Sequence, residues 1–213
     1  KFAGQTWRIV RINEDGTIRI VMQDGINSNA TYRFNSNYNN YTYMYYTNGI
    51  AKTTLENWYQ TNIGSKADLV KNVASGNYYC EQAKAKCDSS WTSGSATMTL
   101  YSSYTPDFKC TTDGNGKGPV NASVGLLSYD EVVHAGGYYG KDNSKYYLYN
   151  SAINWWTMSP AGFLGSTVWR VNTSGNINND NVNVTNRLRA VLSLNADMLV
   201  TGTGTSSDPY VIS

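Results

Sequence analysis

The last third of the chain is a succession of short β-strand patterns, and this succession limits the fold more than any other feature. The clearest pattern is residues 187–195, RLRAVLSLN, where leucine or alanine alternates with arginine, valine or serine. Alternation with a period of two is typical of a strand that buries one face. Residues 154–160 (NWWTMSP), 166–177 (STVWRVNTSGNI) and 208–213 (DPYVIS) predict further strands. Strands that follow one another so closely favour an antiparallel sheet.

Two residue types in these strands have predictable roles. Trp155 and Trp156 are adjacent, so their side chains point to opposite faces of a strand, and at least one is expected to be buried. Arg189 lies within an apolar strand, and we expect it to bind a loop carbonyl or a carboxylate inside the fold.

A β-hairpin is predicted at the start of the chain, over Thr6–Asp24. Two runs rich in β-branched residues flank Asn13-Glu14-Asp15-Gly16, and Gly16 can supply the positive φ that a tight turn needs. Residues 27–49 are polar and aromatic with weak alternation, which indicates a long surface loop or poorly defined strands. Residues 88–125 are rich in turn residues and are predicted to be loops.

Short helices complete the predicted elements. Thr53 followed by Glu56 resembles a capping box, and a second short helix is predicted to begin at Ser65. The strongest signal is Ser128 with Glu131 three residues later, which predicts a third helix. No repeat or linker divides the chain. We therefore predict one domain, residues 1–213, of class α+β, with a mainly antiparallel sheet, two or three short helices and long irregular loops.

Asparagine is concentrated in residues 175–183, GNINNDNVN, directly before the last clear strand. Asparagine is a poor former of both strands and helices. The segment is therefore predicted to be a loop. It is either a solvated loop without a specific role or a polar surface that contacts a ligand.

The composition is typical of an exported surface. Charged residues are 15% of the chain, against about 25% in soluble domains generally, and the chain has 18 tyrosines. Tyrosine with Asn, Ser and Gly is common in binding loops, and also in all-β surface proteins. A formal charge of +2 does not indicate the basic surface that nucleic-acid-binding proteins have, so no nucleic acid partner is expected. No apolar run approaches the roughly 18 residues of a membrane span, so no direct membrane insertion is expected.

The three cysteines are Cys80, Cys87 and Cys110. None belongs to a C-x-x-C pair and the one histidine is far away in sequence, which makes a zinc site improbable. In an exported protein two of the three would oxidise. The pair Cys80–Cys110 is favoured, because it would tie a helical stretch to the loop ending in PDFKC, but three pairings are possible.

The order of these patterns resembles a family of bacterial surface proteins from gut Firmicutes whose C-terminal part has a C-type lectin-like fold. The motifs that carry the resemblance are LLSYDEV, WWTMSP, VWRVNTSGNI and NRLRAVLSLN, and it is vague for residues 25–120. Relatives commonly read Val-Arg-Pro where this chain has Leu188-Arg189-Ala190. The same fold is found in pilin-associated adhesin domains, in formylglycine-generating enzymes and in the variable proteins of diversity-generating retroelements.

The resemblance implies a C-type lectin-like fold with paired N- and C-terminal strands. It also implies an exported ligand-binding module, adhesin-like or lectin-like, that recognises a glycan or a host or bacterial surface protein through loops before the final strands. The chain is then expected at the extracellular cell surface, tethered to an anchoring or pilin-like segment. The predicted ligand-binding residues are polar or aromatic: Phe163, Trp169, Arg170, Asn176, Asn178, Asn179, Asp180, Asn181 and Asn183.

No cofactor is expected. Calcium-dependent lectins use a Glu-Pro-Asn or Gln-Pro-Asp loop with a Trp-Asn-Asp strand, and none of these tripeptides occurs in this chain. Asn178-Asn179-Asp180 offers one carboxylate and two amides, which is a small set for an ion that takes six to eight oxygens.

Two other functions are compatible with the pattern. One is a structural pilin-like or surface-coat subunit with no specific ligand. The other is an enzyme like the formylglycine-generating relatives, which need a cysteine pair near the end of the fold. All three cysteines precede residue 111, so we expect no enzyme and name no catalytic residue. A retroelement-diversified receptor is a special case of the binding module.

Overall fold

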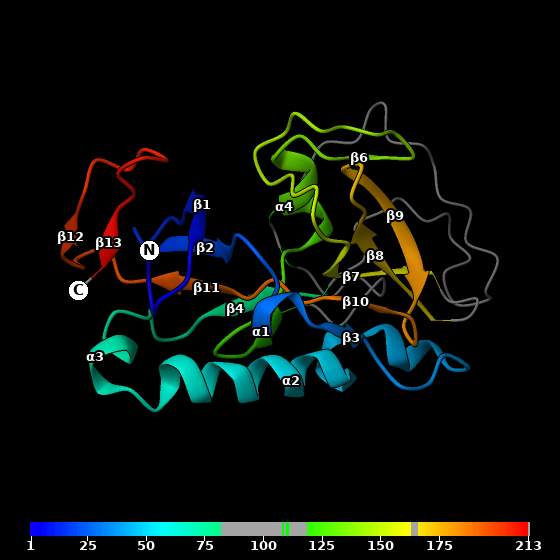
Figure 1. The fold of residues 1–213 in the computed structure, drawn as a ribbon. Helices are drawn as coiled ribbons and strands as arrows, with labels where there is room; N and C mark the ends of the chain where they lie inside the picture. Colours follow the sequence, from blue (N-terminus) through cyan, green and yellow to red (C-terminus); the bar gives the residue numbers. More distant parts are fainter. Residues whose placement is uncertain (82–107, 109, 111–118, 163–165, 213) are drawn as a thin grey trace.

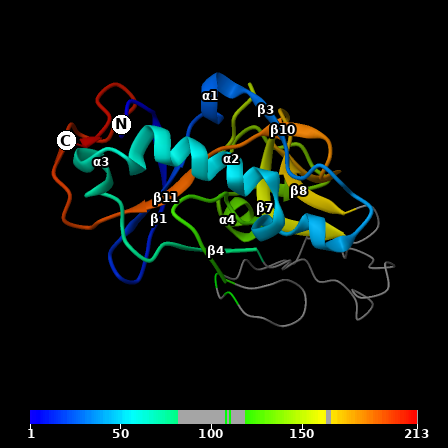
Figure 2. The same cartoon turned by 90° about the horizontal axis from the view of Figure 1, so that it is seen from below.

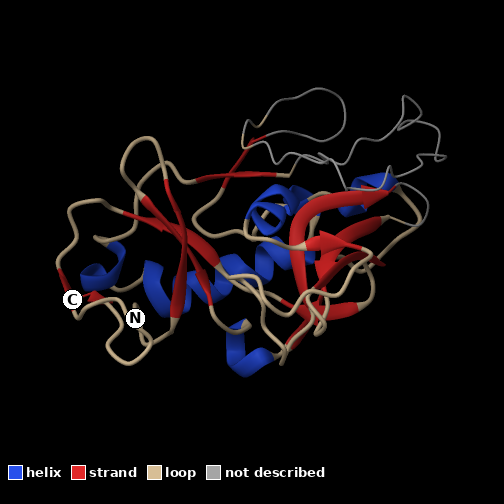
Figure 3. Ribbon diagram, turned by 90° about the horizontal axis from the view of Figure 1, so that it is seen from above, coloured by secondary structure: helices blue, strands red, loops and turns tan. Residues whose placement is uncertain are grey.

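The computed structural model describes residues 1–81, 108, 110, 119–162 and 166–212. The class is α+β, as predicted, with mostly antiparallel sheets and short helices. Figures 1 and 3 show the strands of the two larger sheets as two separate groups. Seen from below, α2 (Ile50–Tyr59) extends beneath both groups (Figure 2).

The predicted N-terminal hairpin is confirmed. β1 (Trp7–Ile12) and β2 (Ile18–Met22) pair antiparallel, and Gly16 in the turn has φ +81°. β11 (Val191–Leu194) pairs with the other side of β2 to complete a three-stranded sheet. All four residues of β11 are buried, so this sheet is packed on the core.

The larger sheet has six strands in the order β3-β10-β7-β8-β9-β6. Its central hairpin, β7 and β8, follows the predicted strands NWWTMSP and STVWRV, and both Trp155 and Trp156 are fully buried. The strands are β3 (Thr31–Arg33), β10 (Thr185–Arg187), β7 (Trp155–Gly162), β8 (Thr167–Val171), β9 (Asn176–Asn181) and β6 (Tyr138–Tyr139).

The asparagine-rich segment is a strand, and its prediction as a loop is wrong. β9 pairs with every residue of β8, from Thr167 opposite Asn181 to Val171 opposite Ile177. Ile177 is fully buried. Five consecutive cross-strand pairs and one buried isoleucine therefore outweigh the low strand propensity of asparagine, as tertiary context often does.

The pattern at residues 187–195 was predicted as one strand, but it forms parts of two. β10 ends at Arg187 in the large sheet and β11 begins at Val191 in the small one. Between them Arg189 is buried, and it donates hydrogen bonds to the carbonyls of Met22 (2.9 Å) and Leu148 (3.0 Å). The predicted internal role of Arg189 is confirmed. Residues 188–190, which lead from β10 to β11, connect the two sheets.

The helices agree with the sequence to different degrees. α4 (Tyr129–His134) has the predicted capping box: the Ser128 hydroxyl accepts from the Glu131 amide (3.2 Å), and the Glu131 carboxylate accepts from the Ser128 amide (2.8 Å). α2 begins after Gly49 rather than at Thr53. A 3₁₀ turn, η2 (Tyr46–Asn48), leads directly into α2, so the helix begins earlier in the chain than predicted. The helix predicted from Ser65 is the short α3 (Ala67–Val70).

The segment predicted as a loop or weak strands, residues 27–49, contains mainly short turns. It forms β3 and is otherwise divided among α1 (Ile26–Asn29), η1 (Tyr41–Met44) and η2. The π-helical turn η3 (Gln60–Gly64) continues α2. No helix among the described residues is long and apolar enough to cross a membrane.

The two ends of the chain lie next to each other (Figure 1). The amide of Ile212 donates to the carbonyl of Lys1 (3.1 Å). The last strands, β12 (Val200–Thr201) and β13 (Val211–Ile212), pair with one another, whereas β1 pairs with β2. The expected pairing of the N- and C-terminal strands with each other is therefore wrong for the described strands, although the two chain ends are in contact.

A disulfide joins Cys80, at the end of β4 (Tyr78–Cys80), to Cys110, with a Cα–Cα distance of 5.6 Å. This is the pairing that the sequence favours. β4 pairs with β5 (Pro119–Asn121), so the disulfide lies beside a short two-stranded sheet. Cys87 falls outside the described residues.

Candidate functional site

Most of the predicted ligand-binding residues come from two neighbouring strands, β8 and β9. The strand register divides them between the two faces of the sheet, because residues directly opposite on antiparallel strands share a face. Arg170 lies opposite Asn178, and Trp169 lies opposite Asn179. Asn176 and Asp180 share the face of Asn178, since successive side chains alternate.

Trp169 is part of the core, and its prediction as a ligand contact is wrong. It is fully buried, and its ring packs on those of Tyr129 (5.0 Å between centroids) and Tyr139 (5.2 Å). The large apolar side chain faces α4 instead of solvent. Phe163 lies outside the described residues, and Asn183 is half-buried in the turn that follows β9.

An ion pair joins the two strands on the opposite face. Arg170 Nε lies 2.9 Å from Asp180 Oδ2, and the two side chains are 18% and 27% exposed. Asn176 on the same face donates from its amide to the Asp142 carboxylate (3.3 Å). These contacts orient the polar groups of β9 while leaving them partly open to solvent.

The outer edge of β9 is open beyond Ile177 among the described residues. β6 pairs only with Asn176 and Ile177. The carbonyl of Ile177 points outward, since it accepts from the Gly140 amide (3.2 Å). By the alternation of a strand, the backbone amide and carbonyl of Asn179 point outward as well. The side chains of Asn179 and Asn181 are exposed.

We call this region the β9 surface. It combines exposed side-chain amides, a half-buried ion pair and outward-facing backbone groups along one sheet edge. Its residues are Arg170, Asn176, Asn178, Asn179, Asp180 and Asn181.

The three residues weighed for calcium do not converge. Asn178 and Asp180 share one face and Asn179 points to the other. The Asp180 carboxylate is also paired with Arg170, and a nearby cation opposes the binding of another. The described part of the chain contains no group of three or more His, Cys, Asp or Glu residues placed to hold a metal ion.

A second site, this one concave, lies at the N-terminal hairpin, and no local sequence pattern indicates it. This cleft has a volume of about 840 Å³ and lies between the turn of the β1–β2 hairpin, residues 74–77 and β11. We call it the hairpin cleft. The residues that matter below are Arg11, Asn13, Glu14, Asp15, Asn77 and Phe108.

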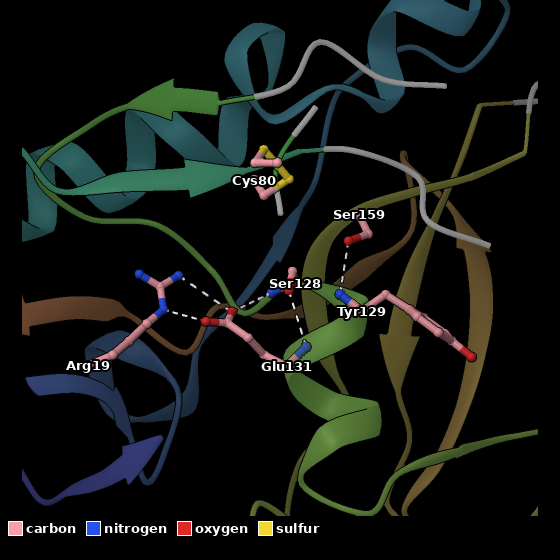
Figure 4. Close-up of a disulfide and its surroundings, with 7 residues drawn as sticks. Arg19, Cys80, Ser128, Tyr129, Glu131 and Ser159 are labelled. Carbon is pink, nitrogen blue, oxygen red and sulfur yellow. Dashed lines mark hydrogen bonds and ion pairs between the residues drawn. A yellow bond between two sulfur atoms is a disulfide. The ribbon is translucent and has the colours of Figure 1, made fainter. Parts of the chain in front are cut away.

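A buried ion cluster supports one wall of the hairpin cleft, and Figure 4 shows its Arg19–Glu131 pair. The Glu131 carboxylate forms ion pairs with Arg19, which is buried, and with Arg11, whose side chain is 30% exposed. The Arg19 guanidinium also lies over the ring of Tyr79, 4.8 Å from its centroid. The cluster therefore fixes the hairpin to α4 and to β4.

The charges in this cluster control the pKa of Glu131. Burial alone would raise the pKa of this carboxyl group. The guanidinium groups of Arg19 and Arg11, with the hydrogen bond from the Ser128 amide, outweigh burial and hold the pKa below its usual value. Glu131 is therefore ionised at neutral pH.

One sequence signal could have revealed this cluster. Arg11 and Arg19 stand directly opposite each other across the hairpin. Like charges in opposite positions on paired strands are destabilising unless a counter-charge lies nearby. The hairpin register thus predicts a carboxylate between them, but it cannot identify Glu131, which is 112 residues away from Arg19 along the chain.

The arrangement defines an α+β domain with an open polar strand edge and a separate polar cleft. Its sequence belongs to a family: residues 15–196, most of the chain, match the model described as "Domain of unknown function (DUF6273)". The chain is therefore a member of the DUF6273 family. Comparisons with curated proteins and with solved structures find no match.

Proposed function

We propose that this chain is an exported cell-surface domain with a C-type lectin-like fold that binds a polar ligand, a glycan or a surface protein, through the β9 surface. The fold assignment rests on the motif order described above, together with the antiparallel sheets and the adjacent chain ends. The disulfide favours an oxidising, extracellular compartment, where such bonds persist.

The composition of β9 carries the proposal. Its six residues, NINNDN, include one buried apolar side chain and five polar ones. β-branched and aromatic residues stabilise strands better than asparagine, over a range of about 1 kcal/mol per site. The polar residues therefore contribute little to the stability of the sheet, and contact with a ligand would explain their presence.

The geometry suits an extended polar partner. Each exposed amide offers two donors and one acceptor, and the backbone of Asn179 adds one donor and one acceptor along the same edge. Arg170 and Asp180 present both charges on one face. A glycan chain or an extended peptide segment lying along the edge could bind the backbone of Asn179 and the side-chain amides of Asn179 and Asn181, and it would reach the ion pair only by crossing to the other face of the sheet.

The test combines a glycan array with a pull-down of surface proteins. We expect a ligand with roughly micromolar affinity (about −8 kcal/mol). The double variant Asn179→Ala/Asn181→Ala should bind at least tenfold more weakly and change stability by only about ±0.5 kcal/mol, because both side chains are exposed. The double variant Asn57→Ala/Asn121→Ala, which alters two exposed asparagines on α2 and β5, is the matched control and should bind like the wild type.

Two results would count against the proposal. An array and a pull-down that both find no ligand would favour the surface-coat role. Equal binding by the wild type and by the Asn179→Ala/Asn181→Ala variant would remove the β9 surface as the contact.

A further inference from the structure

We propose that the hairpin cleft is a second binding site, specific for a neutral saccharide of two or three sugar units. The inference goes beyond the proposed function, because the cleft is built on the three-stranded sheet and the β9 surface on the six-stranded one. Either site can exist without the other.

The size of the cleft fits a small ligand. Small-molecule sites usually enclose about 300–1,000 Å³, and this cleft holds about 840 Å³. The space is larger than one sugar ring needs and is adequate for a short oligosaccharide.

The walls carry planar polar side chains, the groups that bind pairs of neighbouring hydroxyls. Glu14 and Asp15 offer carboxylates, and Arg11 offers a guanidinium. The amides of Asn13 and Asn77 also line the cleft, but both already form hydrogen bonds within the protein, so only part of their capacity is left for a ligand. The Glu14 side chain is exposed, and no described residue bonds to its carboxylate. A sugar hydroxyl can donate to this carboxylate and accept from an amide nearby.

The charge balance argues for an uncharged ligand. Arg11 and Arg19 line the cleft, but both are paired with Glu131. Glu14 and Asp15 add two further carboxylates at the rim. Among the described residues of the cleft, two cations face three carboxylates, so these residues give no excess positive charge that would attract an anionic ligand.

An aromatic ring supplies the apolar contact that the C–H face of a sugar needs. Phe108 is 41% exposed and lines the cleft. Its ring is held on one side by the Arg11 guanidinium, 5.1 Å from the centroid, and by an edge contact with His134 at 5.1 Å. The exposed part of the ring can therefore pack on a ligand without first being ordered.

The cleft is also preformed by rigid contacts. The buried Arg19–Glu131 pair fixes one wall, and Cys110, which lines the cleft, is tied to β4 by the disulfide. Asn77 is held by the Ser193 amide, which donates to its side-chain oxygen (3.1 Å). Preorganised groups reduce the entropy lost when a ligand binds.

The experiment measures binding of defined trisaccharides to the purified chain by calorimetry or NMR titration. The neutral probes are cellotriose, maltotriose, mannotriose and the fully N-acetylated chitotriose, and the acidic probe is a galacturonic acid trisaccharide. At least one neutral probe should bind with millimolar or tighter affinity, and more tightly than the acidic probe.

Ser75→Trp tests the location, because Ser75 is exposed and lines the cleft. The added indole should fill the space and weaken binding of the neutral probe at least tenfold. Ser151→Trp, at an exposed turn elsewhere, is the matched control and should leave binding unchanged. Phe108→Ala should weaken binding without filling the cleft, which separates loss of contact from a folding defect.

The outcomes are decisive in both directions. The inference is overturned if none of the four neutral probes binds, if the acidic probe binds best, or if Ser75→Trp binds as the wild type does. The Asn179→Ala/Asn181→Ala variant should bind the trisaccharide normally. Loss of the β9 ligand with intact trisaccharide binding, or the reverse, shows which of the two sites has failed.

Discussion

An ion cluster and a separate ion pair each join neighbouring elements of this protein, and they differ in their surroundings. At the N-terminal hairpin, the buried Glu131 carboxylate is shared by two guanidinium groups and fixes α4 to β1 and β2. On the large sheet, Arg170 and Asp180 pair across β8 and β9 with both side chains partly exposed. The cluster holds distant parts of the chain together, and the pair joins strands that are already hydrogen-bonded.

The difference indicates which charges serve the fold and which are available for contact. The buried Glu131 carboxylate cannot be removed without leaving the Arg19 cation in a region of low dielectric constant with no counter-ion. The Arg170–Asp180 pair is partly exposed, so water screens its attraction in part and it should contribute less to stability than the buried cluster does. The Arg170–Asp180 pair can therefore be changed, or used by a ligand, at small cost to folding.

Removing the Glu131 charge should have the largest effect. Glu131→Gln keeps the shape of the side chain but leaves Arg19 buried without a counter-ion. Breaking a buried pair in this way costs about 3–5 kcal/mol. Urea unfolding at pH 7 would measure the loss.

Glu56→Gln provides the matched control for that variant. Glu56 pairs with Lys52 one turn away on α2, with side chains 36% and 24% exposed, so the same substitution should cost under about 1 kcal/mol. Similar losses for the two variants would contradict the contrast between buried and exposed pairs.

Acid should destabilise the protein through the same carboxylate. The pKa of Glu131 is lower in the folded chain than in the unfolded chain, so the unfolded state binds a proton first as the pH falls. The stability that this group contributes is complete above the unfolded pKa of about 4.3. It is lost as the pH falls through the lower folded value.

Unfolding free energies measured between pH 7 and pH 3 would check this expectation. The wild type should lose more stability over that range than Glu131→Gln, because the variant has no carboxyl group to protonate at this position. Parallel curves for the two proteins would show that other groups cause the acid sensitivity.

The parts of the fold that depend on local chemistry could be predicted from the sequence. The capping box of Ser128 and Glu131 lies within four residues, and the hairpin turn at Gly16 is equally local. The internal role of Arg189 followed from one charge in an apolar strand. In each case the physical cause lies within a few residues of the feature.

The parts that depend on long-range pairing could not be predicted. β9 is a strand because β8 pairs with it, and the preference of its asparagines points the other way. Trp169 was placed in the site by its position next to Arg170, whereas strand alternation turns the two to opposite faces. The hairpin cleft brings Asn13, Asn77 and Ser193 together from three distant segments, so no local pattern indicates it.

The smallest effect is expected for Asp180→Asn. The substitution keeps the size and planarity of the side chain and removes only its charge, so the ion pair becomes at most a hydrogen bond from the charged Arg170 guanidinium to a neutral amide. Because both side chains are partly exposed, the free energy of unfolding should change by less than about 1 kcal/mol. The affinity for the β9 ligand should change more than stability does. Arg170 no longer has the Asp180 carboxylate as its partner, so its guanidinium can bind the ligand instead. A loss of stability as large as that of Glu131→Gln would show that this pair stabilises the fold. The β9 surface would then have no charged group available for a ligand.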